Sequence, residues 1–151
     1  MAAVGDLDGD GFPDIAAGAV RDDSSGRTDV GSVSLFSGRT GVFLRKLDDP
    51  AATGNSRVGL GLVGVPDYDG DGVPDVAAAA RRENTSGGGN AGRVIVFSGA
   101  DGSVIARLED RDGAGNDYLG FSIVLAGDMN GDGLQDIAAG VHGDDVEGLA
   151  N

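Results

Sequence analysis

The stretch DLDGDGFPD (residues 6–14) returns as DYDGDGVPD (residues 67–75) and as DMNGDGLQD (residues 128–136). The copies begin at positions 6, 67 and 128, so successive copies lie 61 residues apart and need no gap. An exact period of this kind is the signature of a repeat protein. The 151 residues therefore hold about two and a half units of roughly sixty residues each.

Each unit contains four short apolar segments separated by Gly, Asp and Ser residues. All of them are too short for an independent helix and several alternate in polarity, which predicts β-strands. A glycine content of 29 residues supports many tight turns between these strands. The predicted strands are residues 15–20, 33–36, 42–47 and 58–65, then 76–80, 93–99, 104–108 and 119–126.

The two middle segments of each unit are joined by SGRTG or SGADG, a connection typical of a β-hairpin. Four antiparallel strands that recur at a fixed period predict an all-β fold made of β-propeller blades. A β-sandwich that contains a duplication is the alternative. Four polar, Gly-rich segments are predicted to be surface loops that are free to vary; they are residues 21–30, 48–57, 81–91 and 109–118.

The three carboxylate loops place oxygen ligands at positions 1, 3, 5 and 9, with Gly at positions 4 and 6 where the backbone must turn. Ca²⁺ takes six to eight oxygen ligands, mostly carboxylates and carbonyls, so we expect about three calcium sites in the chain. The predicted ligands are Asp6, Asp8, Asp10, Asp14 and the carbonyl of Phe12; Asp67, Asp69, Asp71, Asp75 and the carbonyl of Val73; and Asp128, Asn130, Asp132, Asp136 and the carbonyl of Leu134.

Other interpretations of these loops are weaker. An EF-hand loop would carry Glu at position 12, where this chain has Ala17, Ala78 and Ala139. Acidic turns without a metal are common, but three copies in constant phase would gather carboxylates that raise one another's pKa. Mg²⁺ prefers rigid octahedral sites that keep several waters, so loops that offer this many protein oxygens favour Ca²⁺. Three bound Ca²⁺ would change the formal net charge from −14 to −8.

The net charge of −14 excludes some classes of partner. Nucleic acids and anionic membranes require a basic surface, so neither is expected to bind. No apolar run is long enough for a membrane span, so no membrane insertion is expected. The start MAAVGDLDGD lacks the features of a signal peptide, and we expect any such signal to lie outside this sequence.

These residues together resemble the FG-GAP repeat, the blade of the integrin α-subunit β-propeller and of its bacterial relatives. The resemblance rests on residues 119–141, 58–80 and 2–20, which carry a strand, the DxDGDGxxD loop and a second strand. Val58 and Leu119 stand where the family often has Phe. The resemblance implies that the strand before each loop is the innermost of its blade and that residues 42–47 and 104–108 form the outermost strands.

The resemblance divides the chain into three units. Residues 1–57 would form a first blade that lacks most of its inner strand, residues 58–118 a second blade, and residues 119–151 the first half of a third. Propellers close with four to eight blades, so one chain is incomplete by itself. We therefore expect a homo-oligomer that completes the blades, or further blades in a longer chain; an excised or designed fragment is a third interpretation.

The function that the resemblance implies is a calcium-stabilised, non-enzymatic scaffold of the adhesion type, at the cell surface or outside the cell. Its ligand, an extracellular protein or a glycan, would bind the loops opposite the calcium loops. The alternative is the propeller portion of a secreted polysaccharide lyase or another hydrolytic enzyme. His142, Tyr68 and Tyr118 are interpreted as packing or surface residues, because no set of acid, base and nucleophile emerges from the sequence.

Overall fold

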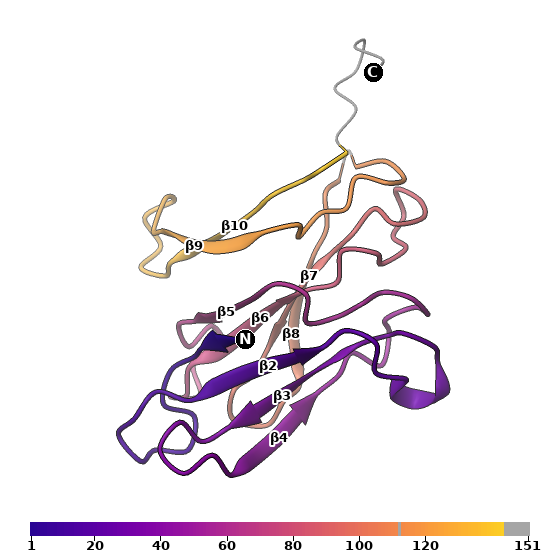
Figure 1. Ribbon diagram of the computed structural model, residues 1–151. Coiled ribbons are helices and arrows are strands. Elements are labelled where there is room, and N and C mark those ends of the chain that lie inside the picture. The colour runs from indigo at the N-terminus through magenta and orange to yellow at the C-terminus, as the bar shows by residue number, and fades with distance from the viewer. Residues whose placement is uncertain (112, 144–151) are drawn as a thin grey trace.

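The computed structural model describes residues 1–111 and 113–143, and within them the protein is all-β. The first sheet contains four antiparallel strands in the order β1-β2-β3-β4 (Figure 1). A short 3₁₀ turn, η1 (Ser24–Gly26), follows β2. The strands of this sheet are β1 (Ala2–Ala3), β2 (Ile15–Ala19), β3 (Ser32–Phe36) and β4 (Phe43–Leu47).

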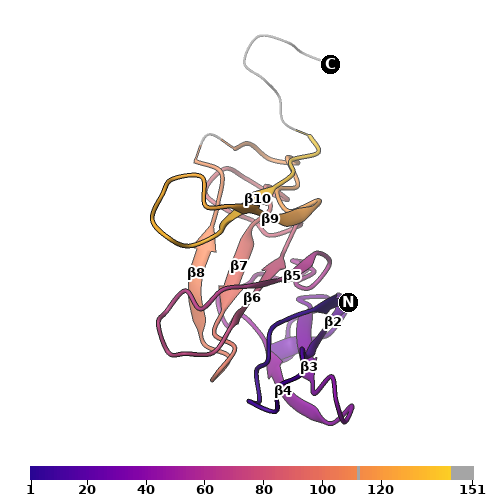
Figure 2. The ribbon, with the colours of Figure 1, turned by 90° about the vertical axis from the view of Figure 1, so that its left-hand side faces the viewer.

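The second sheet repeats the order of the first, as β5-β6-β7-β8, and the third contains the two antiparallel strands β9 and β10. Figure 2 shows the three sheets one after another along the molecule. No helix in the described part of the chain is long and apolar enough to span a membrane. The remaining strands are β5 (Leu62–Val65), β6 (Asp75–Ala79), β7 (Val94–Phe97), β8 (Val104–Leu108), β9 (Ile123–Gly127) and β10 (Asp136–Ala139).

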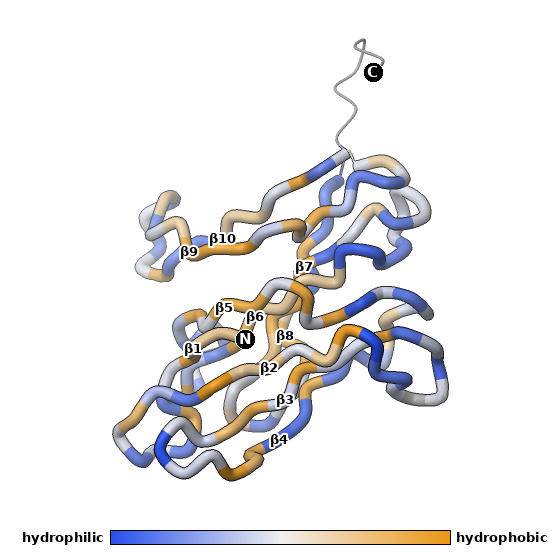
Figure 3. The backbone as a smooth tube through the Cα atoms, in the orientation of Figure 1, coloured by the Kyte–Doolittle hydropathy of each residue, from blue (hydrophilic) through white to orange (hydrophobic). Residues whose placement is uncertain are grey.

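The middle sheet is buried on both faces, which explains the continuous apolar sequences of its central strands. Val76, Ile95 and Phe97 belong to the core shared with the first sheet. Ala77 and Val96, on the opposite face of β6 and β7, belong to a second core that includes Ile123 of the third sheet. Figure 3 shows the apolar residues along the strands and the polar residues in the loops. The sheets therefore pack face to face, as consecutive blades do.

The order of strands within each sheet confirms the predicted fold class. The strand before each carboxylate loop forms one edge of its sheet, and β4 or β8 forms the other edge. The first strands of consecutive sheets also meet, because β1 contacts β5 and β5 contacts β9. The described sheets are open and do not close into a ring. The predicted unit boundaries stay predictions, and residues 112 and 144–151 of those units lie outside the described residues.

Two of the predicted strands begin later than expected. Strand β5 begins at Leu62, four residues after Val58, and β9 begins at Ile123, four residues after Leu119. Val58 instead forms an isolated parallel bridge with Gly31, and Leu119 does the same with Gly92. The glycine that follows, Gly59 in the first case, has a positive φ of 95° and turns the chain away from the strand direction.

Candidate metal sites

Each carboxylate loop folds around the side chain of its first aspartate. Asp6 accepts hydrogen bonds from the N–H groups of Gly9 (2.7 Å), Asp10 (3.1 Å) and Gly11 (2.8 Å). Both glycines have a positive φ, 78° and 87°, a conformation that other residues adopt only with strain. The second and third loops repeat these bonds around Asp67 and Asp128. The recurring sequence therefore specifies one loop conformation three times.

The aspartate at position 9 joins its loop to the hairpin of the same sheet. Asp14 is fully buried, and its two carboxylate oxygens accept from Leu7 N–H at 2.7 Å and Gly38 N–H at 2.9 Å. Asp75 does the same with Tyr68 N–H at 2.7 Å and Gly99 N–H at 3.0 Å. A Cβ on Gly99 would lie 1.8 Å from the Pro74 carbonyl oxygen, so this position requires glycine.

The first two loops each bring three carboxylates together. Oxygens of Asp6, Asp8 and Asp14 lie within 4.8 Å of one another, and so do oxygens of Asp67, Asp69 and Asp71. Ligands of a calcium ion at its usual distances lie up to about 5 Å apart, so both clusters fit a divalent cation. In the described residues, no Lys or Arg forms an ion pair with these carboxylates.

The predicted ligand sets are only partly assembled. Asp10 lies outside the cluster of the first loop, and Asp75 lies outside the cluster of the second. Within the described residues, the third loop forms no cluster of three carboxylates, and its Asn130 amide donates to Asp132 at 2.9 Å. The full ligand sets therefore stay predictions.

The charges of the second loop act on one another. The N–H of Gly72 is the main cause that lowers the pKa of Asp67 below its usual value. Burial, with the nearby Asp69 and Asp67 carboxylates as further causes, raises the pKa of Asp75. A divalent cation would offset both effects that raise this pKa, because it supplies the positive charge that the chain does not.

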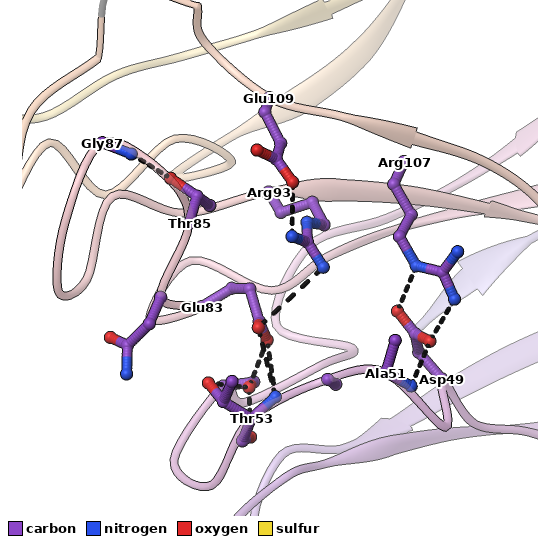
Figure 4. A network of polar contacts seen from close by, with 12 residues as sticks. Asp49, Ala51, Thr53, Glu83, Thr85, Gly87, Arg93, Arg107 and Glu109 are labelled. Atoms are coloured by element: carbon purple, nitrogen blue, oxygen red, sulfur yellow. Dashed lines mark hydrogen bonds and ion pairs between the residues drawn. The ribbon is translucent and has the colours of Figure 1, made fainter.

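The opposite end of the sheets holds a polar network that the sequence did not reveal (Figure 4). Glu83, in the loop after β6, is 1% exposed and accepts two hydrogen bonds from Thr53 N–H, each 3.1 Å long. It also accepts from the Ser56 hydroxyl and lies 3.9 Å from the Arg93 guanidinium, which in turn pairs with Glu109. The Glu83 side chain therefore fixes the connection between the first two sheets.

A second ion pair in this network joins β8 to the segment that follows β4. The Arg107 guanidinium on β8 donates two hydrogen bonds, of 2.9 and 2.5 Å, to the carboxylate of Asp49, which is 1% exposed. Burial would raise the pKa of Asp49, but Arg107 and the Ala51 N–H hold it below its usual value. Asp49 and Glu83 lie in segments predicted to be variable surface loops, and that prediction was wrong for these buried residues.

Comparison with known proteins gives the family of this fold. The model of the FG-GAP repeat matches residues 2–36 and 58–97. Integrin alpha-11 from Homo sapiens is 33% identical over 149 residues, which cover 93% of this chain. This chain is a region of integrin-alpha-type FG-GAP repeats. Integrin alpha-6 from Gallus gallus is 31% identical over 150 residues, and integrin alpha-2 from Mus musculus is 28% identical over 130 residues; these cover 95% and 80% of the chain.

The FG-GAP region spans 11–13% of the length of these integrin relatives. The residues considered for catalysis, His142, Tyr118 and Tyr68, contact rings or backbone groups of neighbouring residues. The ring of His142 lies 5.1 Å from that of Phe121 and 6.4 Å from that of Tyr118. The Tyr68 hydroxyl donates to the carbonyl of Gln135, which connects the second and third carboxylate loops. These contacts agree with the packing roles predicted from the sequence.

Proposed function

We propose that the FG-GAP region is a calcium-stabilised scaffold in which each carboxylate loop holds one Ca²⁺. The observation that carries this proposal is the convergence of three carboxylates in each of the first two loops without a cation from the chain. Like charges at this distance oppose folding, and a divalent cation converts their repulsion into attraction. About three ions per chain follow from the three loops of one backbone conformation.

The proposed ligand sets are those of the sequence: positions 1, 3, 5 and 9 of each loop and the carbonyl at position 7. Hydrogen bonds from the loop backbone orient the carboxylates at positions 1, 3 and 5, so the ligands are arranged before the ion arrives. The bound ion would connect the two ends of the loop and fix the strands on either side of it. In the third loop, Asn130 supplies a neutral oxygen, and we expect weaker binding there.

We also propose a non-enzymatic adhesion role at the cell surface or outside the cell, supported by the similarity to integrin alpha chains. Extracellular proteins or glycans would bind the loops opposite the carboxylate loops. The open sheets would be completed by further blades of a longer chain or by other copies of this chain. Light scattering at several concentrations tests the second possibility; a monomer at every concentration contradicts self-completion.

Removal of calcium tests the proposal directly. A site filled at a thousand times its dissociation constant stabilises the folded chain by about 4 kcal/mol. We therefore expect EDTA to lower the melting temperature by several degrees or more, and added Ca²⁺ to restore it. Calorimetric titration should show about three sites, one of them weaker. A melting temperature that is the same in EDTA and in excess Ca²⁺ would overturn the proposal, and equal rescue by Mg²⁺ would overturn the choice of ion.

A further inference from the structure

A cavity of about 200 Å³ lies between the second and third sheets, and its walls are basic and aromatic. Arg81 and Arg82 follow the end of β6, so the length of this strand separates them from the second carboxylate loop. The other lining residues come from the segment before β9 and from the segment after β10. The five lining residues are Arg81, Arg82, Tyr118, Phe121 and His142.

Planar groups form the walls of this cavity. The Arg81 guanidinium lies over the ring of Phe121, with its carbon 5.8 Å from the ring centroid. The His142 ring lies on the same Phe121 at a tilt of 33°, and it meets Tyr118 edge to face. Stacking of this kind holds a guanidinium in place while its N–H donors remain available.

The arginines of the cavity have donors without acceptors. The Nε atoms of Arg81 and Arg82 are buried, and neither finds a hydrogen-bond partner among the described residues. The Nε atoms of Arg57 and Arg93 are likewise buried without a partner in the described part of the chain, and Ser56 accepts a hydrogen bond from the Arg82 backbone N–H. Within the described ranges, neither Arg81 nor Arg82 forms an ion pair, whereas Arg93 and Arg107 both pair with carboxylates. Buried donors without acceptors are costly, so the two arginines favour an anion.

The charge of the chain limits which anion this can be. The chain has 11 Lys and Arg residues and one His against 25 acidic residues, so three of its twelve basic groups lie in this cavity. A net charge of −14 repels polyanions, and a cavity of this size holds only a small group. A guanidinium fork matches a carboxylate with two parallel hydrogen bonds, and the aromatic walls suit an apolar or planar body beside it.

We propose that this cavity binds a single carboxylate group carried on a small apolar or planar body. Its source is an acidic peptide side chain or a small organic acid such as a sugar acid; both present the same chemistry. The inference goes beyond the calcium scaffold, because none of the five lining residues is a proposed calcium ligand. Asp117, the acid next to Tyr118 in the sequence, is buried and does not line the cavity.

The previous junction between sheets offers a matched control. One period earlier, Arg82 corresponds to Arg21, but Tyr118 and Phe121 correspond to Arg57 and Leu60. Arg21 is exposed and follows β2 as Arg82 follows β6. The aromatic walls therefore exist only at the later of these two junctions, and an Arg21 variant removes the same charge without touching the cavity.

The test is a titration of the calcium-loaded chain with benzoate, followed by the NMR signals of the arginine Nε–H groups and of His142. We expect saturable shifts at Arg81 and Arg82, and no shifts with benzamide, which has the same shape without the charge. The Arg81→Gln and Arg82→Gln variants should each weaken binding about tenfold or more, whereas Arg21→Gln leaves it unchanged. The melting temperatures of the variants establish that the fold persists.

Further arms separate the sources of the carboxylate. N-acetylglutamate amide represents a peptide side chain and glucuronate represents a sugar acid; the tighter binder names the source. Equal shifts with sulfate at the same ionic strength would show general anion attraction and overturn the proposal. Benzoate binding that appears only in an Asp144→Asn/Asp145→Asn variant would also overturn the proposal, because the chain's own acidic side chains would then occupy the cavity of the wild type. An absence of shifts with benzoate in the wild-type chain would also overturn it, and none of these results bears on calcium.

Discussion

The two ends of the sheets use acidic residues in opposite ways. At one end, the carboxylate loops gather Asp67, Asp69 and Asp71 in positions open to solvent, with no cation supplied by the described chain. At the other end, Asp49 and Glu83 are buried, and each lies against an arginine of another segment. On the proposed function, the first end takes its countercharge from an ion in solution, whereas the described chain itself neutralises the buried acids of the second end.

The largest effect that would sharpen this comparison is expected at Arg107. Replacement by Met leaves the Asp49 carboxylate buried without its guanidinium, and we expect a loss of about 2–3 kcal/mol in the free energy of unfolding. Lys46 occupies the same position one period earlier but pairs with the part-exposed Asp22 at 2.5 Å. Lys46→Met should therefore cost only about 0.5 kcal/mol.

Urea unfolding of both variants, in excess Ca²⁺ and in EDTA, measures the difference. Since the opposite end has its own countercharges, the loss at Arg107 should be nearly the same with and without the metal. Equal losses for Arg107→Met and Lys46→Met would show that burial of Asp49 does not matter. A loss at Arg107 that disappears in EDTA would show that the two ends are not independent.

The next effect tests the carboxylate loops. Asp71→Asn keeps an oxygen acceptor for the Val73 N–H (2.8 Å) and removes one negative charge from the cluster. If the variant binds Ca²⁺ tenfold more weakly, it loses about 1.4 kcal/mol of stability in the presence of the metal. In EDTA the sign should reverse, because the variant has less repulsion with Asp67 and Asp69.

Asp23→Asn is the matched control, because Asp23 lies at the opposite end and accepts a single hydrogen bond from Asp29 N–H. It should change stability by less than about 0.5 kcal/mol in either condition, as most surface substitutions do. The sign change for Asp71→Asn, measured by thermal melts with and without Ca²⁺, is the decisive readout. A variant that is destabilised equally in both conditions would mean that Asp71 is structural and holds no ion.

Much of the carboxylate end could be predicted from the sequence, since it is local. The nine residues of each loop contain both the aspartates and the glycines that turn the backbone around them, so the period alone revealed the motif. The four strands per unit were also predicted, because their apolar residues recur at the same spacing. The predicted strand bounds differ by at most two residues elsewhere and by four residues at the starts of β5 and β9, where an isolated bridge replaces the first residues of the strand.

The opposite end could not be predicted, because its contacts join distant segments. Asp49 and Arg107 are 58 positions apart, and nothing near either residue indicates the other. One weak signal existed: Asp22 and Glu83 are both acidic one period apart within otherwise variable loops. The hydrogen bonds that the N–H groups of Gly38 and Gly99 donate to the aspartates at position 9 were missed for the same reason. The Ser-Gly pairs that contain these glycines predicted only a turn.

The smallest effect concerns acid, to which Asp22 at one end and Asp75 at the other should respond with opposite signs. Hydrogen bonds from Lys46, and then from Ser32 and Ser24, hold the pKa of Asp22 at about 2, below its usual 3.8. The folded chain thus keeps this carboxylate ionised where the unfolded chain protonates it. Its stabilisation is complete above about pH 4–5 and is lost as the pH falls toward 2. Solvent screening limits this contribution to about 1 kcal/mol or less.

Asp75 should behave in the opposite way without calcium, because burial raises its pKa in the folded chain. A carboxyl group of this kind favours folding when protonated, and this contribution is lost as the pH rises through its folded pKa. In EDTA, the Asp22→Asn variant should therefore become less sensitive to acid than the wild type. Asp75→Asn should remove a part of the pH dependence that has the reverse slope. Melts between pH 2.5 and 6 measure both slopes, and slopes of the same sign would contradict the opposite pKa shifts of Asp22 and Asp75.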